Sequence, residues 1–366
     1  MKVVFRHSDL QEGVNIVLKA VPARTTMPIL ECILIDASFD RIRLVANDME
    51  LGIETQVNGE ILERGKIALD AKIFSDIVRK LPDSDVTIAV NDRDIAVITC
   101  EKAKFSIPGK PGDDFAGLPV IESRDSFSIS QYSLRELIRQ TIFSIAPNES
   151  NKLMTGELFE IRNNTLRVVA LDGHRISIRN LELQDACQDR RVVVPGKTLN
   201  EVSKILSGET DEMVTVFFSD NHMLFEFGQT KVLTRLIEGE YFRIDQMLSS
   251  DYETKITINR LQFMNCIDRA TLLVRESDKM PVIFDITDDS LEMRIDTQLG
   301  SMNESMMTEK TGRDIVIGFN PKFLLDALRV TEDEEVSLYF VNAKAPCFIR
   351  DDRQSYIYLI LPVNIR

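Results

Sequence analysis

The chain has 366 residues, 44% of them hydrophobic, which is enough for two or three domains with proper cores. Its 58 acidic residues outnumber its 44 basic ones, and the net charge of −14 argues against a nucleic-acid-binding protein unless the basic residues gather on one surface. The longest apolar run, Tyr356–Leu361, is too short to cross a membrane, and the N-terminal MKVVFRHSDL lacks the apolar segment of a secretion signal.

The cysteines indicate a reducing, cytoplasmic location. They are odd in number, scattered, and form no CxxC pair, which disfavours both a disulfide framework and a zinc site. We therefore expect buried free thiols, with no metal and no other cofactor. The five cysteines are Cys32, Cys100, Cys187, Cys266 and Cys347.

In chain order, each third of the sequence is predicted to begin with a strand and a helix: at 3–6 and 9–21, at 126–129 and 133–145, and at 255–258 and 259–273. Two strands follow, then a further strand and helix, and then closing strands, which gives the order β-α-β-β-β-α-β-β-β. Strands joined mostly by short turns predict antiparallel sheet with both helices on one face.

The second strand and helix of each third form a repeat. Its copies are GKIALDAKIFSDIVRKL at 65–81, RVVVPGKTLNEVSKIL at 191–206 and DIVIGFNPKFLLDALRV at 314–330. Ile67, Val193 and Val316 are 126 and 123 residues apart, so this repeat marks a larger domain that occurs three times. The expected fold class is α+β, with three repeated domains at 1–123, 124–251 and 252–366.

The predicted helices carry more positive charge than the rest of the chain. They contain twelve basic and seven acidic residues, a net charge of +5, so the remainder carries −19. The attraction of cations to helix C-termini explains some of these residues singly, but the whole pattern favours a basic surface that holds phosphates without reading sequence. A cation also follows the first helix of each third. The residues expected to face nucleic acid are Arg24, Lys72, Arg79, Lys80, Arg135, Arg139, Lys152, Lys197, Lys204, Arg260, Arg269, Arg275, Lys322 and Arg329.

Three of these cations oppose the preference of the helix itself. Lys72, Lys197 and Lys322 occupy equivalent positions near helix starts, where the helix dipole favours anions. A negatively charged partner opposite these positions explains the three lysines better than helix stability does.

Four short motifs on this repeat make the chain similar to a known family. They are Arg24 followed by MPIL at 27–30, LDGHRI at 171–176, IGFNPKFLLDAL at 317–328 and LILPV at 359–363. Over its whole length the chain resembles the bacterial DNA polymerase III β subunit, the sliding clamp of replication. The resemblance implies a head-to-tail homodimer in which each chain forms half of a closed ring, with its helices toward duplex DNA.

The resemblance also implies two protein contacts. At the dimer interface, Phe105 and Ile107 of the first domain would meet Leu272 and Leu273 in the third domain of a second copy. A groove between the second and third domains would bind short linear peptides of the DNA polymerase III α subunit, the clamp loader and repair proteins. Its matching residues are Met154, Leu171, Gly173, His174, Arg175, Ile176, Phe242, Met247, Asn320, Phe323, Pro346, Leu361, Pro362 and Val363.

The chain departs from the family pattern at the rim of this groove. The family usually has Thr where this chain has Leu171, and a Tyr-Pro pair where it has Tyr241 and Phe242. A basic residue common a few positions later is replaced around Gln246 and Met247. We expect these departures to leave the groove in place but to change its rim and the peptides that it prefers.

Two other functions can be read from the same residues. A nucleotide-dependent hydrolase would use Lys197 and His174, but Arg191 stands where a phosphate-binding loop needs its first glycine. The second alternative is a monomeric peptide-binding scaffold with no role on DNA. The function that accounts for the repeat, the charges and the motifs together is that of a non-enzymatic processivity factor, and this is the function that we predict.

Overall fold

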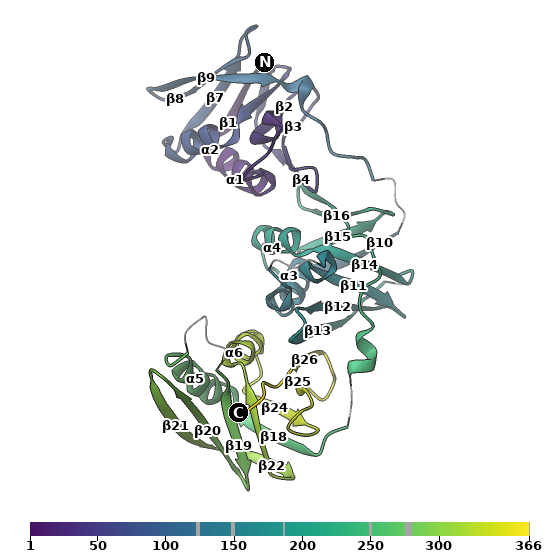
Figure 1. Ribbon diagram of the computed structural model, residues 1–366. Helices are drawn as coiled ribbons and strands as arrows, with labels where there is room; N and C mark the ends of the chain where they lie inside the picture. Colours follow the sequence, from purple (N-terminus) through teal and green to yellow (C-terminus); the bar gives the residue numbers. More distant parts are fainter. Residues whose placement is uncertain (122–124, 148–150, 186, 249–250, 275–279, 366) are drawn as a thin grey trace. The chain divides into compact units, whose positions relative to one another are not determined.

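The structure is a computed structural model that describes residues 1–121, 125–147, 151–185, 187–248, 251–274 and 280–365. The chain forms two compact units (Figure 1). Unit 1 comprises Met1–Leu134 and Asn200–Leu236, and unit 2 comprises Arg135–Leu199 and Ile237–Arg366. No helix among the described residues is both long and apolar enough to span a membrane.

Unit 1 contains one antiparallel sheet of thirteen strands, in the order β10-β15-β16-β17-β4-β3-β2-β6-β9-β8-β7-β1-β5. Its strands are β1 (Lys2–Arg6), β2 (Cys32–Asp36), β3 (Ile42–Asn47), β4 (Leu51–Val57), β5 (Glu60–Glu63), β6 (Lys66–Asp70), β7 (Asp85–Val90), β8 (Ile95–Cys100), β9 (Ala103–Pro111), β10 (Ser126–Ser130), β15 (Met213–Phe218), β16 (His222–Phe227) and β17 (Thr230–Arg235). Its helices are α1 (His7–Val17) and α2 (Ala71–Lys80), with short 3-10 turns η1 (Leu18–Ala20), η2 (Pro28–Glu31) and η3 (Gly112–Asp114).

Unit 2 contains a nine-stranded antiparallel sheet, β14-β11-β12-β13-β26-β25-β24-β18-β22, and a four-stranded one, β21-β20-β19-β23. Its strands are β11 (Gly156–Arg162), β12 (Thr165–Leu171), β13 (Arg175–Glu182), β14 (Arg190–Pro195), β18 (Thr254–Asn259), β19 (Val282–Thr287), β20 (Ser290–Thr297), β21 (Gly300–Met307), β22 (Glu309–Gly312), β23 (Ile315–Phe319), β24 (Glu335–Phe340), β25 (Cys347–Arg350) and β26 (Tyr356–Ile360). Its helices are α5 (Arg260–Thr271) and α6 (Pro321–Val330), with 3-10 turns η4 (Ile142–Ser144), η5 (Lys152–Thr155) and η6 (Ile244–Met247). Helices α3 (Gln131–Arg139) and α4 (Gly196–Ile205) have residues in both units.

The predicted fold class is confirmed, and the structure adds strands to it. Each third has an extra strand after its alternating strand, namely β4, β13 or β21, and the first and third also have β5 or β22. Strand β21 was missed because its sequence, GSMNESMM, is mostly exposed and shows no apolar alternation. Only its pairing with β20, from Ser290↔Met307 to Thr297↔Gly300, makes it a strand.

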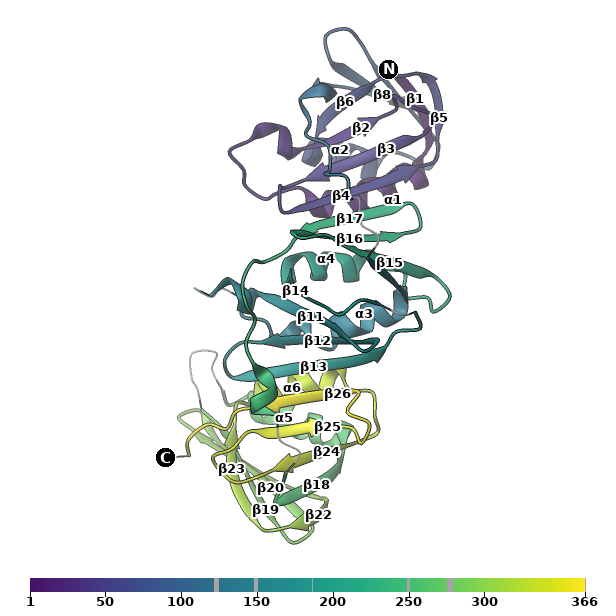
Figure 2. The ribbon, with the colours of Figure 1, turned by 90° about the vertical axis from the view of Figure 1, so that its right-hand side faces the viewer.

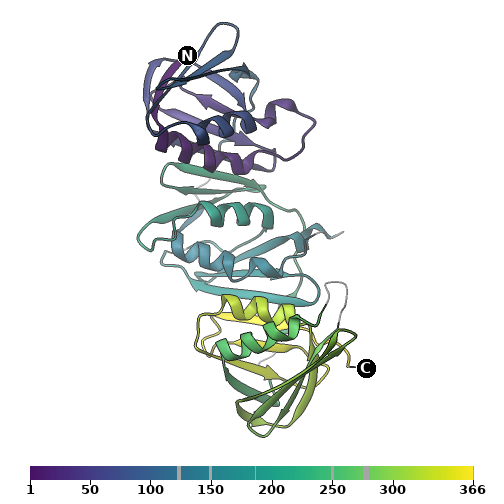
Figure 3. The same ribbon diagram turned by 90° about the vertical axis from the view of Figure 1, so that its left-hand side faces the viewer.

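The helices bury one apolar face each. In unit 1, α1 contacts α2 and strands β3 and β4, and Leu10, Val14 and Val17 on α1 are buried. In unit 2, α5 lies beside α6 (Figure 3). A row of four packed aromatic rings starts on α5 and continues into the sheets. Its members are Phe263 on α5, then Phe284, Phe319 and Phe340, with successive ring centroids 5.6, 5.6 and 6.4 Å apart. These spacings are typical of favourable aromatic contacts in a close-packed core.

Strands from different repeats pair directly at two places, which we call seams (Figure 2). At the first seam, Thr230–Thr234 of β17 pairs with Leu51–Thr55 of β4. At the second seam, Arg175–Arg179 of β13 pairs with Tyr356–Ile360 of β26. Both units therefore combine strands from two repeats, and the domain limits 1–123, 124–251 and 252–366 stay a prediction.

One carboxyl group is buried in unit 2 without compensation. Glu157 on β11 is fully buried, and neither of its carboxyl oxygens has a hydrogen-bond partner among the described residues. Removing the charged form from water raises the pKa of Glu157 to about 8, with the nearby Thr141 hydroxyl acting in the opposite direction. Glu157 is therefore protonated in the folded chain at neutral pH.

This burial makes stability depend on pH. Between the ordinary pKa of a glutamate and about 8, the unfolded chain has lost a proton that folded Glu157 retains, so stability falls as pH rises. The unfolding free energy of the wild-type chain should fall by about 1.4 kcal/mol for each pH unit between pH 5 and 8 because of Glu157. We expect this part of the pH dependence to be absent in Glu157→Gln. Urea unfolding followed by near-ultraviolet circular dichroism measures this, because the chain has no Trp and five of its six tyrosines lie in unit 2.

The exposed Glu182 provides a matched control in the same unit. Glu182→Gln should unfold with the pH dependence of the wild-type chain. Parallel pH profiles for Glu157→Gln and the wild type would show that Glu157 is charged in the folded state.

Candidate functional site

The three lysines predicted at equivalent helix positions occupy them in the structure. Lys72, Lys197 and Lys322 are each the second residue of a helix, α2, α4 or α6, and each is exposed. None of these helices has an acidic residue in its first turn. In α2 and α6 the first backbone N–H groups are bound by capping side chains, Asp70 at 2.8 Å and Asn320 at 3.0 Å. The caps satisfy the backbone, while the lysines add positive charge where the dipole is already positive.

Several other cations predicted to face DNA are held by acidic groups of the chain. Arg79 pairs with Asp76, Lys204 with Glu201, Arg269 with Glu304, Arg329 with Asp268, and Arg139 with Glu136 and Glu332. Arg260 instead donates to the carbonyls of Asp333 and Leu328, at 2.9 and 3.2 Å. Their charge is partly neutralised within the fold.

The remaining predicted cations are more available. Arg24, Lys80, Arg135 and Lys152 are exposed and, like Lys72 and Lys322, form no ion pair with the described residues. Arg275 lies outside the described residues. Sequence reasoning placed all fourteen in one class. The pairs of Arg79, Arg139 and Lys204 with a carboxylate three residues earlier have a helical spacing that the sequence shows. The pairs of Arg269 and Arg329 join residues distant in sequence and appear only in the fold.

The residues predicted to form the peptide groove lie around the second seam. Beyond β26, the chain is held on two sides: the Leu361 N–H donates to the His174 carbonyl at 2.9 Å, and the Val363 N–H donates to the Gly318 carbonyl at 2.8 Å. Leu361 is 38% exposed between these anchors, and Pro362 and Val363 are half-buried. Leu361 therefore lies next to the β12–β13 turn, and Val363 lies next to β23.

An apolar cluster supports one side of this surface. Leu171 and Ile176 are buried in it, and Met154 and Phe242 pack against it. Phe242, which replaces the proline of the family pattern, packs edge-on against Tyr241 with ring centroids 5.6 Å apart. Tyr241 donates to the Val169 carbonyl at 3.3 Å, and burial raises the pKa of its hydroxyl. Met247, on η6, is 56% exposed.

On the other side of this surface, Arg175 binds groups from three separate segments of unit 2. Its guanidinium donates to Asp172 at 3.0 Å, to Asp326 at 2.7 Å and to the Phe143 carbonyl at 2.5 Å. It also lies 4.5 Å from the centre of the Phe323 ring. This side chain is 9% exposed, so the ion pairs are shielded from water.

His174 and its neighbours complete the surface. The His174 ring stacks on Phe323 with centroids 6.0 Å apart, and His174 itself is exposed. Gly173 has a φ of +82°, which favours glycine, and Pro346 and Asn320 are partly exposed. Asp172 accepts from the backbone N–H groups of His174 and Arg175, so it serves the turn and the arginine.

Sequence reasoning missed Phe143 and Asp326. Asp326 lies on α6 and Phe143 on η4, and neither is among the residues predicted to form the groove. Only the fold shows that both contact Arg175.

The four predicted dimer residues differ in exposure. Phe105 on β9 is 39% exposed and Leu272, which follows α5, is 78% exposed. Ile107 is buried, and Leu273 packs on the core beside Gly300 of β21. Phe105 and Leu272 are therefore available to a partner, while Ile107 and Leu273 are packed within their own units.

The whole chain matches models of one family. The N-terminal domain of the DNA polymerase III beta subunit matches residues 1–119, its central domain residues 128–242, and its C-terminal domain residues 245–364. A "Beta sliding clamp" of Staphylococcus epidermidis is 33% identical over 375 residues, covering 100% of this chain and 99% of that protein.

Solved structures agree. A putative DNA polymerase III beta subunit from Eubacterium rectale is 62% identical with a TM-score of 0.97, and the Bacillus subtilis DNA polymerase sliding clamp is 33% identical with a TM-score of 0.97. Each comparison covers 100% of both chains. Three α+β domains in one chain, matched over its whole length by clamp structures, are the architecture of a sliding clamp of DNA replication. The chain belongs to the DNA polymerase III beta subunit family, as its sequence predicts.

The contacts of Arg175 give a test of how the second seam is held. Replacing Arg175 by Ala leaves two poorly exposed carboxylates, Asp172 and Asp326, without their cation. We expect a loss of about 3–5 kcal/mol in the unfolding free energy of unit 2. Arg175→Lys should lose less, because a lysine can neutralise one carboxylate but cannot span both and stack on Phe323. Tyrosine circular dichroism during urea unfolding measures the difference, and equal stability of Arg175→Ala and the wild type would contradict it.

Proposed function

We propose that two copies of this chain close head to tail into a ring that encircles duplex DNA and tethers replication proteins to it. The observation that carries this proposal is the set of exposed lysines at the second residue of α2, α4 and α6. Cations at three equivalent helix starts oppose helix stability but match a polyanion. Family membership supports the same reading.

The DNA contact is proposed to be electrostatic and independent of sequence. Its main contributors are the cations that no acidic residue among the described residues neutralises: Arg24, Lys72, Lys80, Arg135, Lys152 and Lys322, together with the exposed Lys197. The ion-paired arginines add a weaker positive potential, and a DNA contact by Arg275, which lies outside the described residues, stays a prediction. Few strong contacts suit a ring that must move along DNA.

Two strand edges suit the ring closure. In unit 1, residues 103–108 of β9 pair with β8 along one edge, and among the described residues no strand lies along the other, where Phe105 is exposed. In unit 2, β21 ends the four-stranded sheet, next to Leu272 and Leu273. Unpaired edges with exposed apolar residues favour strand pairing between chains. Because the two edges belong to different units of one chain, the contact is heterologous and two copies can close it.

The surface around the second seam is proposed to bind partner peptides. Leu361 and His174 are exposed beside Phe323 and the apolar cluster, so a leucine or aromatic side chain can be buried there. Each such side chain would contribute roughly 1.5–3 kcal/mol. Micromolar binding requires about 8 kcal/mol, so the peptide must make further contacts besides these side chains. The proposed partners are the DNA polymerase III α subunit, the clamp loader and repair proteins.

The chain is proposed to act in the cytoplasm without catalysing a reaction. Its contribution is topological, because the ring keeps a polymerase on its template. Asp172, which a catalytic reading would pair with His174, is engaged by Arg175 and the turn backbone.

Retention on DNA tests the ring. Protein loaded by its cognate clamp loader should stay on a nicked circular plasmid through gel filtration and leave when the plasmid is linearised. Native mass spectrometry should give about twice the 41.6 kDa of one chain. Equal retention on circular and linear DNA would rule out encirclement.

A matched pair of variants locates the closing contact. Leu272→Asp should give a monomer that is not retained. Phe39→Asp, which changes a 69% exposed aromatic residue outside the proposed edges, should behave as wild type.

Peptide binding tests the second-seam surface. Leu361→Ala should weaken a fluorescent peptide from the cognate polymerase α subunit about tenfold, because a leucine contact of roughly 1.4 kcal/mol is lost. Deleting residues 361–366 should abolish binding and leave the dimer intact. Leu299→Ala, at a 47% exposed leucine elsewhere in unit 2, is the control. Unchanged affinity in the deletion variant would remove this assignment.

A further inference from the structure

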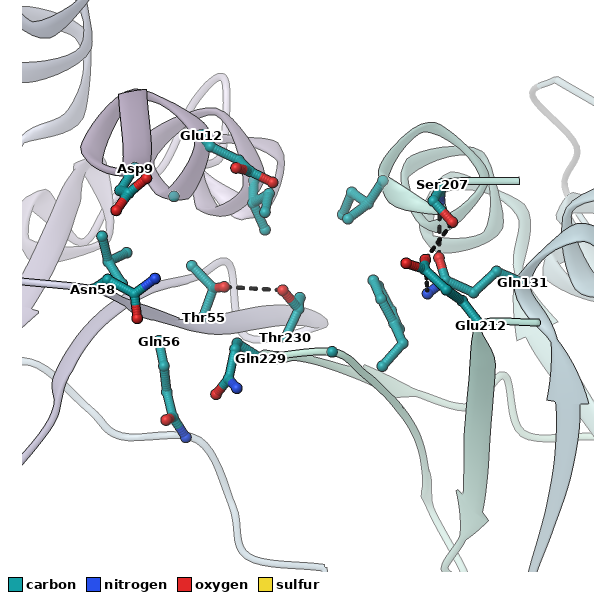
Figure 4. A pocket seen from close by; sticks show the side chains of 16 residues that line it. Asp9, Glu12, Thr55, Gln56, Asn58, Gln131, Ser207, Glu212, Gln229 and Thr230 are labelled. Atoms are coloured by element: carbon teal, nitrogen blue, oxygen red, sulfur yellow. Dashed lines mark hydrogen bonds between the residues drawn. The ribbon is translucent and has the colours of Figure 1, made fainter. Parts of the chain in front are cut away.

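Strand β10 ends the thirteen-stranded sheet of unit 1, and among the described residues β15 is the only strand that pairs with it. The backbone groups on that side are engaged at both ends of the strand. The Asp125 carbonyl accepts from the Phe218 N–H at 3.1 Å, and the Gln131 N–H donates to the Glu212 carbonyl at 2.7 Å. The Gln131 side chain also donates to the Glu212 carboxylate at 3.1 Å, beside an acid-lined pocket (Figure 4). The inner edge of β10 is therefore fully paired.

The outer edge of β10 is open. Backbone groups alternate in direction along a strand, so Asp125, Phe127 and Ile129 face β15, while Ser126 and Ser128 face away from it. Within the part of the chain that the structure describes, the outward N–H and C=O groups of these two serines have no hydrogen-bond partner. Ser126 is exposed, and the sequence SFSIS has no lysine or proline that would discourage another strand from pairing.

The other two repeats fill this place with a strand of their own. Strands β1, β10 and β18 are equivalent, because each runs directly into the first helix of its repeat. Strand β1 pairs with β7 on one side and with β5 on the other, and β18 pairs with β24 and β22 in the same way. Strand β10 has β15 in the place of β7 and β24, but it lacks the second partner among the described residues.

The part of the second repeat that corresponds to β5 and β22 makes other bonds. It is the segment between β13 and β14, whose described residues form no pair with β10. The Leu183 N–H donates to the Asn164 carbonyl at 2.7 Å, and the Asn163 N–H donates to the Asp189 carboxylate at 3.1 Å. Both bonds hold the segment to the β11–β12 turn. The place of a second partner strand beside β10 is thus left open by its own repeat.

Two rows of side chains lead across the sheet to this open edge. One row passes from Ser126 to Phe217 and Leu224, and it is apolar beyond the serine. The other passes from Ser128 to Thr215, and it is polar. Side chains on neighbouring strands stabilise a sheet when they match across the strands. An added strand would therefore need an apolar residue beside Ser126 and a polar one beside Ser128.

We propose that the open edge of β10 pairs with an extended segment of a partner protein, antiparallel to β10 as β5 is to β1. In chain order the segment has a polar residue beside Ser128, an aliphatic one beside the buried Phe127 and an apolar one beside Ser126. Strand β5 begins with this order, Glu60-Ile61-Leu62. Backbone hydrogen bonds supply the affinity, and the side chains select the partner.

A second copy of this chain fits the edge less well. Its own outward residues on β10 are serines, so it would place a serine, not an apolar residue, beside Ser126. Strands β5 and β22, which fill the equivalent places, have only four residues each, so a short segment is enough. The edge of β10 is also separate from the edges proposed to close the ring and from the proposed peptide surface at the second seam.

Backbone amide NMR of the full-length chain, isotopically labelled at serine, tests the proposal. The probe is the peptide Gly-Glu-Ile-Leu-Glu-Arg, which is the sequence of residues 59–64. The control is the same peptide with proline in place of its first glutamate, because proline has no N–H to donate to β10. We expect saturable shifts of the Ser126 and Ser128 amide signals with the first peptide and at least tenfold weaker binding of the second. Shifts of these signals that grow with chain concentration alone would identify a second copy as the occupant and overturn the proposal.

Variants at one position separate strand pairing from other attraction. Ser128→Pro removes an outward N–H but no bond to β15, so the fold should be kept while the peptide binds at least tenfold more weakly. Ser128→Ala keeps the N–H and should bind as the wild type does, and so should Leu361→Ala at the second seam. If Ser128→Pro does not fold, Ser126→Pro provides the same test. Equal binding by the wild type and a folded proline variant, or no saturable shift with the first peptide, would overturn the proposal.

Discussion

The pairing of strands across repeats is the constraint on which the rest of this structure depends. A sheet that ended at each repeat would expose unpaired N–H and C=O groups at every boundary. Instead β17 completes the sheet of β4, and β26 completes that of β13. The backbone bonds fix the register, and register decides which side chains meet at a seam. The position of Arg175 at the second seam is set by this register.

The two seams have the same antiparallel strand pairing but different side chains. The second is filled by charged and aromatic side chains: Arg175 between two aspartates, Arg139 between two glutamates, and Arg179 opposite Tyr356. The first has paired threonines and a hollow lined by acids. Repetition therefore sets where the seams occur in this chain, while substitution within the repeat sets which side chains meet there.

Much of the fold follows from local sequence. The helices α1 to α6 are visible because apolar residues such as Leu10, Val14 and Val17 recur at helical spacing. Capping side chains also mark the starts of α2 and α6, at Asp70 and Asn320. Strand β21 is not visible, since its order comes from a neighbour rather than from its own apolar pattern. Surface positions such as Lys72 were also predictable, because a helix start is a local feature. The environment of Arg175 was not, because Phe143 and Asp326 are distant in sequence from it and from each other.

Buried Glu157 and the lysines at the helix starts show that this chain is not optimised for stability alone. An acidic residue in the first turn of a helix contributes about 0.3–1 kcal/mol, and α2, α4 and α6 each have a lysine there instead. Directed evolution for heat resistance would thus favour aspartate or glutamate at positions 72, 197 and 322. A variant selected in this way would unfold at a higher temperature while losing the charges proposed to hold DNA, so thermal stability is a poor guide to fitness at these three sites.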